Sequence, residues 1–219
     1  TPFPREISFY FEGGIRSFVQ YLNRNRKALH DVVYGSQVVQ VEELNGAYVE
    51  IEVAIQYGDY YSESCLAFTN TIHTPDGGTH IEGLRAALTR TINYYAKKAG
   101  VLKESDPSFT GEDTYEGLTA IVSVKHPEPQ FESQTKVKLL NPELKGLVQT
   151  MAGQLLGDFL QRDTRGAKAI YEKCLVSSRA RVASKRARDL IRSSPLQSTT
   201  LPGKLADCSS NDPTQSEMY

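Results

Sequence analysis

Hydrophobic and polar residues alternate most clearly over residues 47–57. The apolar positions there are Val49, Ile51, Val53 and Ile55, and the polar positions between and beyond them include Glu50, Glu52 and Gln56. Because successive side chains of a strand point to opposite faces, this pattern predicts a strand with one buried and one wet face, as in an antiparallel sheet or near its edge. A turn should follow at Gly58 and Asp59, and residues 61–70 are predicted to be the partner strand.

A long amphipathic helix is predicted to begin at Thr79, after a break at Asp76, Gly77 and Gly78. Thr79 and Glu82 have the spacing of a capping box. The apolar stripe of this helix is Ile81, Leu84, Leu88, Ile92 and Tyr95, and Gly100 is a suitable C-terminal cap. Two interpretations of the Asp-Gly-Gly-Thr-His sequence stay open: a turn that glycine permits, or a helix N-terminus open to an anion.

The other predicted elements complete an α/β domain. A strand is predicted over residues 5–11, a helix over 14–30, a short helix over 112–116, a strand over 118–125 and a loop over 126–133. Asn141 and Pro142 should open a second amphipathic helix. Its apolar stripe is Leu144, Leu147, Val148, Met151, Leu155 and Phe159. A basic helix should follow Asp163 and Thr164 and run to about residue 193, before a connector over residues 194–212.

Composition narrows the class of protein. The chain has 219 residues, 39% hydrophobic and 23% charged, which suits a globular protein. It has no run of 18 apolar residues, so no membrane span is expected. The start lacks a signal peptide and an initiator Met, so we expect it to lie inside a longer protein. Three widely spaced cysteines, Cys65, Cys174 and Cys208, fit a reducing compartment.

The net charge of −1 conceals two opposed blocks. Residues 165–192 carry a charge of +7, which leaves −8 for the remainder. Such a division indicates either self-complementary packing or a polyanion partner. The basic residues are interleaved with alanines and not with aromatic residues. This favours a helix that contacts the backbone of a nucleic acid over one whose side chains stack on single-stranded bases. A helix face that is only solvated is an equally good interpretation. The candidate DNA-backbone contacts are Arg179, Arg181, Lys185 and Arg186.

No catalytic motif stands out, and an independent active site is not expected. The four histidines (His30, His73, His80 and His126) are scattered, and no metal-binding cluster is expected. Lys136, in the loop sequence Ser-Gln-Thr-Lys, is either a solvated lysine or a phosphate ligand. A compact ammonium on a long stem can reach a γ-phosphate, and the neighbouring amide of Gln134 can bind phosphate oxygens.

Five segments, in order along the chain, resemble the B subunits of bacterial type IIA topoisomerases. They are Phe11-Glu12-Gly13-Gly14-Ile15, Asp76-Gly77-Gly78-Thr79-His80, Glu116-Gly117-Leu118 with Val122-Ser123-Val124-Lys125, Gln134-Thr135-Lys136, and Leu201-Pro202-Gly203-Lys204-Leu205-Ala206-Asp207-Cys208. The first segment and the overall spacing are more similar to gyrase than to topoisomerase IV.

This resemblance implies an α/β (α+β) fold of the ribosomal protein S5 domain 2-like type. Residues 1–163 would be the transducer domain, 164–194 a long basic connecting helix, and 195–219 a linker with the truncated start of a TOPRIM domain. The motifs of the preceding GHKL ATPase domain are not in this stretch, nor is the complete TOPRIM metal site. The segment alone is therefore expected to be inactive and to hold no cofactor.

The resemblance also implies roles for single residues. Gln134 and Lys136 would contact the γ-phosphate of ATP in the adjacent GHKL domain, with Lys136 as the catalytic group, and Arg85 would line a cavity for DNA. ATP and Mg²⁺ are expected in the intact protein. Expected partners are the GHKL and TOPRIM domains, double-stranded DNA, the gyrase A subunit, and a second B subunit, but no membrane, in a bacterial cytoplasm or an organelle.

Three alternatives to a gyrase transducer remain at this point. The chain could be the corresponding segment of the topoisomerase IV B subunit, because the two enzymes share the later motifs. It could be a stand-alone nucleic-acid-binding module with an S5-like fold, which the basic helix would suit. It could also be a purely structural spacer, in which Lys136 has no special role.

Overall fold

The computed structural model describes residues 12–103 and 106–193. Within them, five strands form one sheet: β1 (Val33–Val41), β2 (Ala47–Tyr57), β3 (Ser64–Thr69), β4 (Ile72–His73) and β5 (Leu118–Lys125). The α-helices are α1 (Gly14–Leu22), α2 (Thr79–Lys98), α3 (Gly111–Tyr115), α4 (Pro142–Arg162) and α5 (Thr164–Ser193), and a short 3-10 helix (Glu42–Leu44) follows β1. The strand predicted over residues 5–11 and the connector over 194–212 lie outside the described residues.

The strand order in the sheet is β1-β2-β5-β3-β4. β5 is antiparallel to β2 and parallel to β3. The prediction that residues 61–70 pair with residues 47–57 is therefore wrong, because β5 lies between these two strands. Almost all of β5 is buried, and a strand apolar on both faces belongs in the middle of a sheet. β1, which the sequence did not predict, pairs with the other edge of β2.

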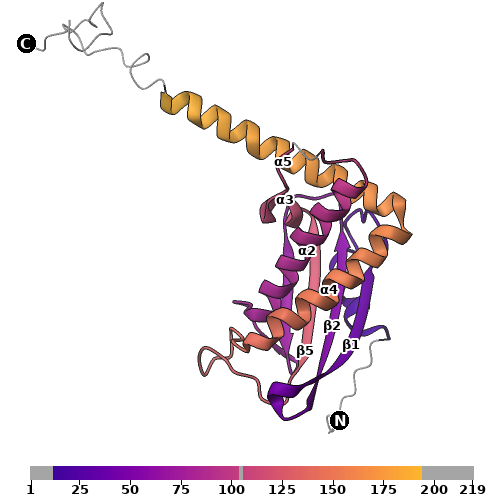
Figure 1. Ribbon diagram of the computed structural model, residues 1–219, viewed down its shortest axis with the longest axis vertical. Coiled ribbons are helices and arrows are strands. Elements are labelled where there is room, and N and C mark those ends of the chain that lie inside the picture. The colour runs from indigo at the N-terminus through magenta and orange to yellow at the C-terminus, as the bar shows by residue number, and fades with distance from the viewer. Residues whose placement is uncertain (1–11, 104–105, 194–219) are drawn as a thin grey trace, which may run out of the picture. The chain divides into compact units, whose positions relative to one another are not determined.

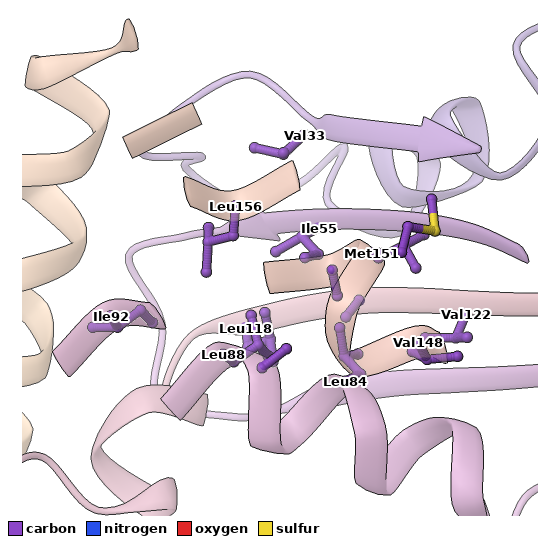
Figure 2. Close-up of a cluster of buried hydrophobic side chains, with 14 of the residues drawn as sticks. Val33, Ile55, Leu84, Leu88, Ile92, Leu118, Val122, Val148, Met151 and Leu156 are labelled. Carbon is purple, nitrogen blue, oxygen red and sulfur yellow. The ribbon is translucent and has the colours of Figure 1, made fainter. Parts of the chain in front are cut away.

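Helices α2 and α4 lie side by side across one face of the sheet (Figure 1). Figure 2 shows side chains of the two helices, among them Leu88 and Leu156, meeting those of the strands, such as Ile55 and Leu118. The predicted apolar stripes are confirmed, because all but three of their members are buried and Tyr95, Leu147 and Leu155 are half-buried. Burial of each aliphatic side chain contributes about 1.5–3 kcal/mol to this core.

The second face of the sheet is covered in part by α1. A smaller core forms there from Val19, Val32, Ala54 and Ile121. The helix predicted over residues 14–30 ends earlier, at Leu22. It stops because the buried side chain of Asn23 turns to the sheet, where its amide group donates to Gln56 Oε1 at 2.8 Å and its carbonyl accepts from the Thr119 hydroxyl at 2.9 Å.

The first compact unit of the chain runs to Ser178. It includes the first half of α5 because Ala167, Ile170, Tyr171 and Cys174 are buried in the main core. The second unit begins at Arg179, and its described residues continue the helix to Ser193. Among the described residues, no helix combines the length and hydrophobicity that crossing a membrane requires.

Candidate functional site

The Gln134-Thr135-Lys136 segment is the tip of a small hairpin that connects β5 to α4. Its two arms are joined by backbone hydrogen bonds from the Glu132 N–H to the Lys138 carbonyl (3.0 Å) and from the Leu140 N–H to the Gln130 carbonyl (2.8 Å). The Lys136 N–H donates to the Ser133 carbonyl (3.0 Å), and Lys136 itself is left-handed, with φ 57°. A tight turn followed by a left-handed residue is typical of three-residue hairpin loops. The segment is therefore an ordered turn.

Gln134 and Lys136 are exposed at this tip. The Lys136 ammonium lies 5.8 Å from the centroid of the Phe131 ring and has no carboxylate partner among the described residues. The other lysine of the hairpin, Lys138, differs because its ammonium is 3.0 Å from Glu132 Oε1. The tip thus carries an exposed ammonium without a carboxylate partner and an exposed amide, as far as the described residues extend.

The base of the hairpin is attached to the turn that precedes α2. The Asp76 N–H donates to the Val137 carbonyl (3.0 Å), the Leu139 N–H to the Gly77 carbonyl (3.0 Å), and the Thr79 N–H to the Leu139 carbonyl (3.1 Å). The third of these bonds occupies the Thr79 N–H, the first amide of α2. The Asp-Gly-Gly-Thr-His sequence therefore forms a turn at which both glycines have positive φ.

Gly78 is the helix N-cap, with φ 131° and no side-chain cap. A Cβ atom at Gly78 would lie 2.2 Å from the Leu139 carbonyl oxygen, so no side chain fits between the turn and the hairpin. The predicted capping box is wrong. The Thr79 hydroxyl oxygen is buried without a hydrogen bond among the described residues, and the Glu82 carboxylate pairs with Lys145 at 2.9 Å.

A polar cluster supports the other arm of the hairpin at the start of α4. The side-chain oxygen Oδ1 of Asn141 accepts from the Gln130 N–H (2.6 Å), and its side-chain amide donates to Glu143 Oε1 (2.8 Å). Buried His126 accepts the Glu128 N–H on Nδ1 (3.1 Å), so its proton is on Nε2, 2.9 Å from Glu143 Oε1. Asn141 precedes the helix as predicted, but its side chain binds the hairpin instead of a helix amide.

Two ionisable groups near the hairpin have altered pKa values. Burial lowers the pKa of His80 to about 4, so its imidazole is neutral near pH 7. Its Nε2 lies 3.2 Å from the Thr74 hydroxyl, and its Nδ1 has no hydrogen bond among the described residues. For Glu143, burial raises the pKa, but hydrogen bonds from its own N–H, from Asn141 and from His126 outweigh burial, and the net pKa is lowered.

Arg85 lies on α2 but takes no part in the hairpin. Its guanidinium pairs with Glu63 Oε1 at 2.8 Å and lies 5.3 Å from the centroid of the Tyr115 ring. The carboxylate compensates its charge in this structure, which spacing along the helix could not have predicted. In the second unit, Arg179, Lys185 and Arg186 are exposed and Arg181 is half-buried.

The structure also places residues that sequence reasoning missed. Backbone hydrogen bonds from Leu139 to Gly77 and Thr79 join two motifs about 60 residues apart. No pattern of side chains in the sequence predicts a bond between backbone groups. The described residues contain no group of His, Cys, Asp and Glu that could hold a metal ion. Cys65 and Cys174 are unpaired, and burial raises the pKa of each thiol to about 12, so neither is an activated nucleophile.

Comparison with known proteins identifies similar chains. Residues 14–190 match the family model for DNA gyrase B. The DNA gyrase B subunit of Clostridium acetobutylicum is 49% identical over 212 residues, which cover 96% of this chain but 32% of that protein. The DNA gyrase B subunit of a Streptococcus pyogenes strain is 48% identical over 216 residues and is also covered to 32%. The chain thus spans about a third of the length of these relatives.

Solved structures agree with this match. The 43K ATPase domain of Thermus thermophilus gyrase B, in complex with an aminocoumarin, superimposes with a TM-score of 0.69 at 40% identity, covering 83% of this chain and 47% of that chain. The ATP-binding domain of Francisella tularensis topoisomerase IV has a TM-score of 0.66 at 22% identity, covering 80% of this chain and 45% of that chain, and shares the fold.

Proposed function

The chain belongs to the DNA gyrase B family, and we propose that it is the transducer segment of a gyrase B protein. In this proposal the domain has the ribosomal protein S5 domain 2-like fold and α5 is its long connecting helix. It couples ATP binding and hydrolysis in an adjacent GHKL domain to DNA strand passage and supercoiling. The match to the DNA gyrase B family model and the 48–49% identity to DNA gyrase B subunits favour gyrase over the alternative.

The observation that carries this proposal is the exposed tip, where the Lys136 ammonium has no carboxylate partner within residues 12–103 and 106–193. The donor set fits a γ-phosphate: Lys136 supplies a compact positive charge, and the Gln134 amide can donate to a phosphate oxygen. The carboxylate of Glu132, which would repel a phosphate, is compensated by Lys138. Mg²⁺ would be held together with the nucleotide by groups outside the described residues.

The contact would act as a switch. ATP supplies a γ-phosphate that is lost on hydrolysis, so Lys136 has a partner in one state of the cycle and lacks it in the other. A hydrogen bond to a charged group contributes about 1.5–3 kcal/mol. Such a difference changes the ratio of two domain arrangements by roughly 10- to 150-fold. A shift of this size makes one arrangement predominate when the two are otherwise close in free energy.

Replacement of Lys136 in the intact protein tests the proposal. Lys136→Ala should lower ATP turnover by about 100-fold, as expected when one donor to a transition-state charge is removed, while nucleotide binding stays largely intact. Lys138→Ala is the matched control, because it removes a lysine of the same hairpin whose charge is already paired. Normal turnover by Lys136→Ala would leave the segment as a structural spacer.

The intact protein supplies the rest of the machinery in this proposal. ATP and Mg²⁺ would bind in the GHKL domain. The TOPRIM domain, the gyrase A subunit, and a second B subunit would complete the enzyme that acts on double-stranded DNA. Arg85 would line the DNA cavity once its ion pair with Glu63 opens or is shared with a phosphate. The basic residues of the second unit would contact the DNA backbone, in a bacterial cytoplasm or an organelle.

A further inference from the structure

The turn before α2 and the Lys136 hairpin form one small sheet. Residues 76–79 run parallel to residues 137–139, which pair in turn with residues 130–132 of the first arm. Every one of these connections is a backbone hydrogen bond. A displacement of the hairpin as a whole must therefore either break them or move the start of α2.

We propose that this junction is the link through which the Lys136 hairpin moves α2, and that Gly78 is the residue that positions the hairpin on the helix. The inference rests on the proposed γ-phosphate contact of Lys136 and goes beyond it, because it assigns the next element that moves. It also gives a structural reason for the two glycines before α2.

The junction is stiff because it leaves no space for adjustment. Three backbone hydrogen bonds join the turn to the hairpin. Gly78 brings the two backbones so close that a methyl group would displace the Leu139 carbonyl. Beyond the junction, α2 is a continuous helix of 20 residues, and Leu84, Leu88 and Ile92 on it are fully buried. A shift at its first turn is therefore carried along a packed element.

The junction also has a feature of an element with a second arrangement. Two of the three buried side-chain atoms that lack a hydrogen bond among the described residues, Thr79 Oγ1 and His80 Nδ1, lie here. A buried polar group without a hydrogen bond destabilises the arrangement that contains it. A second arrangement that gave either atom a hydrogen bond would remove this penalty.

Hydrogen–deuterium exchange on the intact gyrase B protein, with and without a non-hydrolysable ATP analogue, tests the link. We expect the analogue to slow exchange by at least about tenfold in residues 130–140 and also in residues 76–84, whose amides include the Thr79 N–H bonded to Leu139. Both effects should disappear in Lys136→Ala and persist in Lys138→Ala. Residues 118–125, in the central strand, are the internal reference.

The outcomes separate the two proposals. Slower exchange in the hairpin with no change in residues 76–84 would overturn the link and leave the γ-phosphate contact intact. No change in either segment would overturn the γ-phosphate contact, and the link with it. A response of both segments that survives Lys136→Ala would show that α2 senses the nucleotide by another route, which also overturns the link.

A pair of glycine substitutions in the intact protein tests the role of Gly78. Gly78→Ala should lower kcat for ATP by at least about tenfold with little change in KM, because the pocket is untouched but Lys136 is displaced. Gly100→Ala is the control: Gly100 also has positive φ (71°) at the other end of α2, but a Cβ there meets open space. Equal kcat for the two variants would refute the assignment. If Gly78→Ala does not fold, exchange in the unsubstituted protein decides.

Discussion

Replacing the buried His80 should make the stability of this chain less sensitive to acid. The His80 ring is fully buried at the start of α2, where a positive charge would lack both water and a carboxylate partner. The positive end of the helix dipole also disfavours protonation there. In the unfolded chain the same ring is hydrated and takes up a proton at its usual pKa of 6.5. His80→Gln removes this titration and keeps a donor and an acceptor for Thr74.

The size of the effect follows from the two pKa values. Because the folded pKa of His80 is about 4, only the unfolded state binds a proton as the pH falls below 6.5. The free energy of unfolding is therefore not reduced by this group above pH 6.5 and decreases as the pH falls. Between about pH 7 and about pH 5 the loss is about 2 kcal/mol. His80→Gln should therefore lose about 2 kcal/mol less than the unsubstituted chain over the same interval.

Urea denaturation at the two pH values measures this difference. His30, whose pKa is also lowered by burial, is present in both proteins and cancels in the comparison. His73→Gln, at an exposed position on β4, is the control and should keep the pH dependence of the unsubstituted chain. Identical pH dependence of His80→Gln and the unsubstituted chain would refute the reasoning, since it would mean that the folded protein accommodates the charged imidazole.

Three further predictions concern other parts of the chain. Lys173→Ala should lower the free energy of unfolding by about 1–3 kcal/mol, because the Lys173 ammonium is 3.6 Å from Glu116 Oε1 and both side chains are mostly buried. Lys168→Ala, which breaks an exposed ion pair with Glu172, is the control and should lower it by under about 0.5 kcal/mol. Thermal unfolding of both variants measures the difference. Lys136→Gly should raise stability by about 1 kcal/mol relative to Lys136→Ala, because glycine adopts the left-handed conformation without strain. The isolated chain should bind duplex DNA only weakly in a salt titration. Tight binding would favour a stand-alone nucleic-acid-binding module if its salt dependence disappeared on neutralising Arg179, Arg181, Lys185 and Arg186.

The sequence predicted those helices and strands in which the spacing of apolar residues reveals the buried face. Strands β2 and β5 have the predicted bounds, and α2, α4 and α5 begin where their signals place them. β1 was missed because its middle is largely exposed and only Val33 and Val41 at its ends are buried. Its position depends on other elements: a Cβ at Gly35, for example, would lie 3.1 Å from the side chain of Leu155 on α4.

The pairing error has a similar cause. The sequence suggested that the strand after the turn at Gly58 returns beside β2, as in a hairpin. Instead, Gly58 and Gly117 approach so closely that a Cβ at Gly117 would lie 2.5 Å from the Gly58 carbonyl oxygen, and β5 takes the place beside β2. Such a contact joins backbones far apart in the sequence and leaves only an isolated glycine as its sign.

For the candidate site, the sequence predicted the chemistry of the tip but not the way it is held. An ammonium and an amide can be recognised in any exposed loop, whereas the bonds that join Leu139 to Gly77 and Thr79 involve only backbone atoms. Asn141 was predicted as the residue that caps α4, and it does precede the helix. Its side chain, however, accepts a hydrogen bond from the Gln130 N–H and not from a helix amide. The supports of the hairpin could therefore be identified only in three dimensions.

The stiffness of these supports determines how much of a phosphate contact can become movement. A mobile loop would bind the phosphate at the cost of its own ordering, about 1–2 kcal/mol per residue, and would follow the phosphate without displacing anything else. The Lys136 hairpin is already ordered by its turn and by its bonds to α2 and α4, so little of the contact energy is needed for ordering. The left-handed conformation of Lys136 costs about 1 kcal/mol, less than the roughly 1.5–3 kcal/mol of a charge-assisted hydrogen bond. The rest of the contact energy can act only through the hydrogen bonds that join the base of the hairpin to the turn before α2. Substitutions that weaken these bonds should therefore reduce the coupling of the phosphate contact to movement of α2 more than they reduce nucleotide binding.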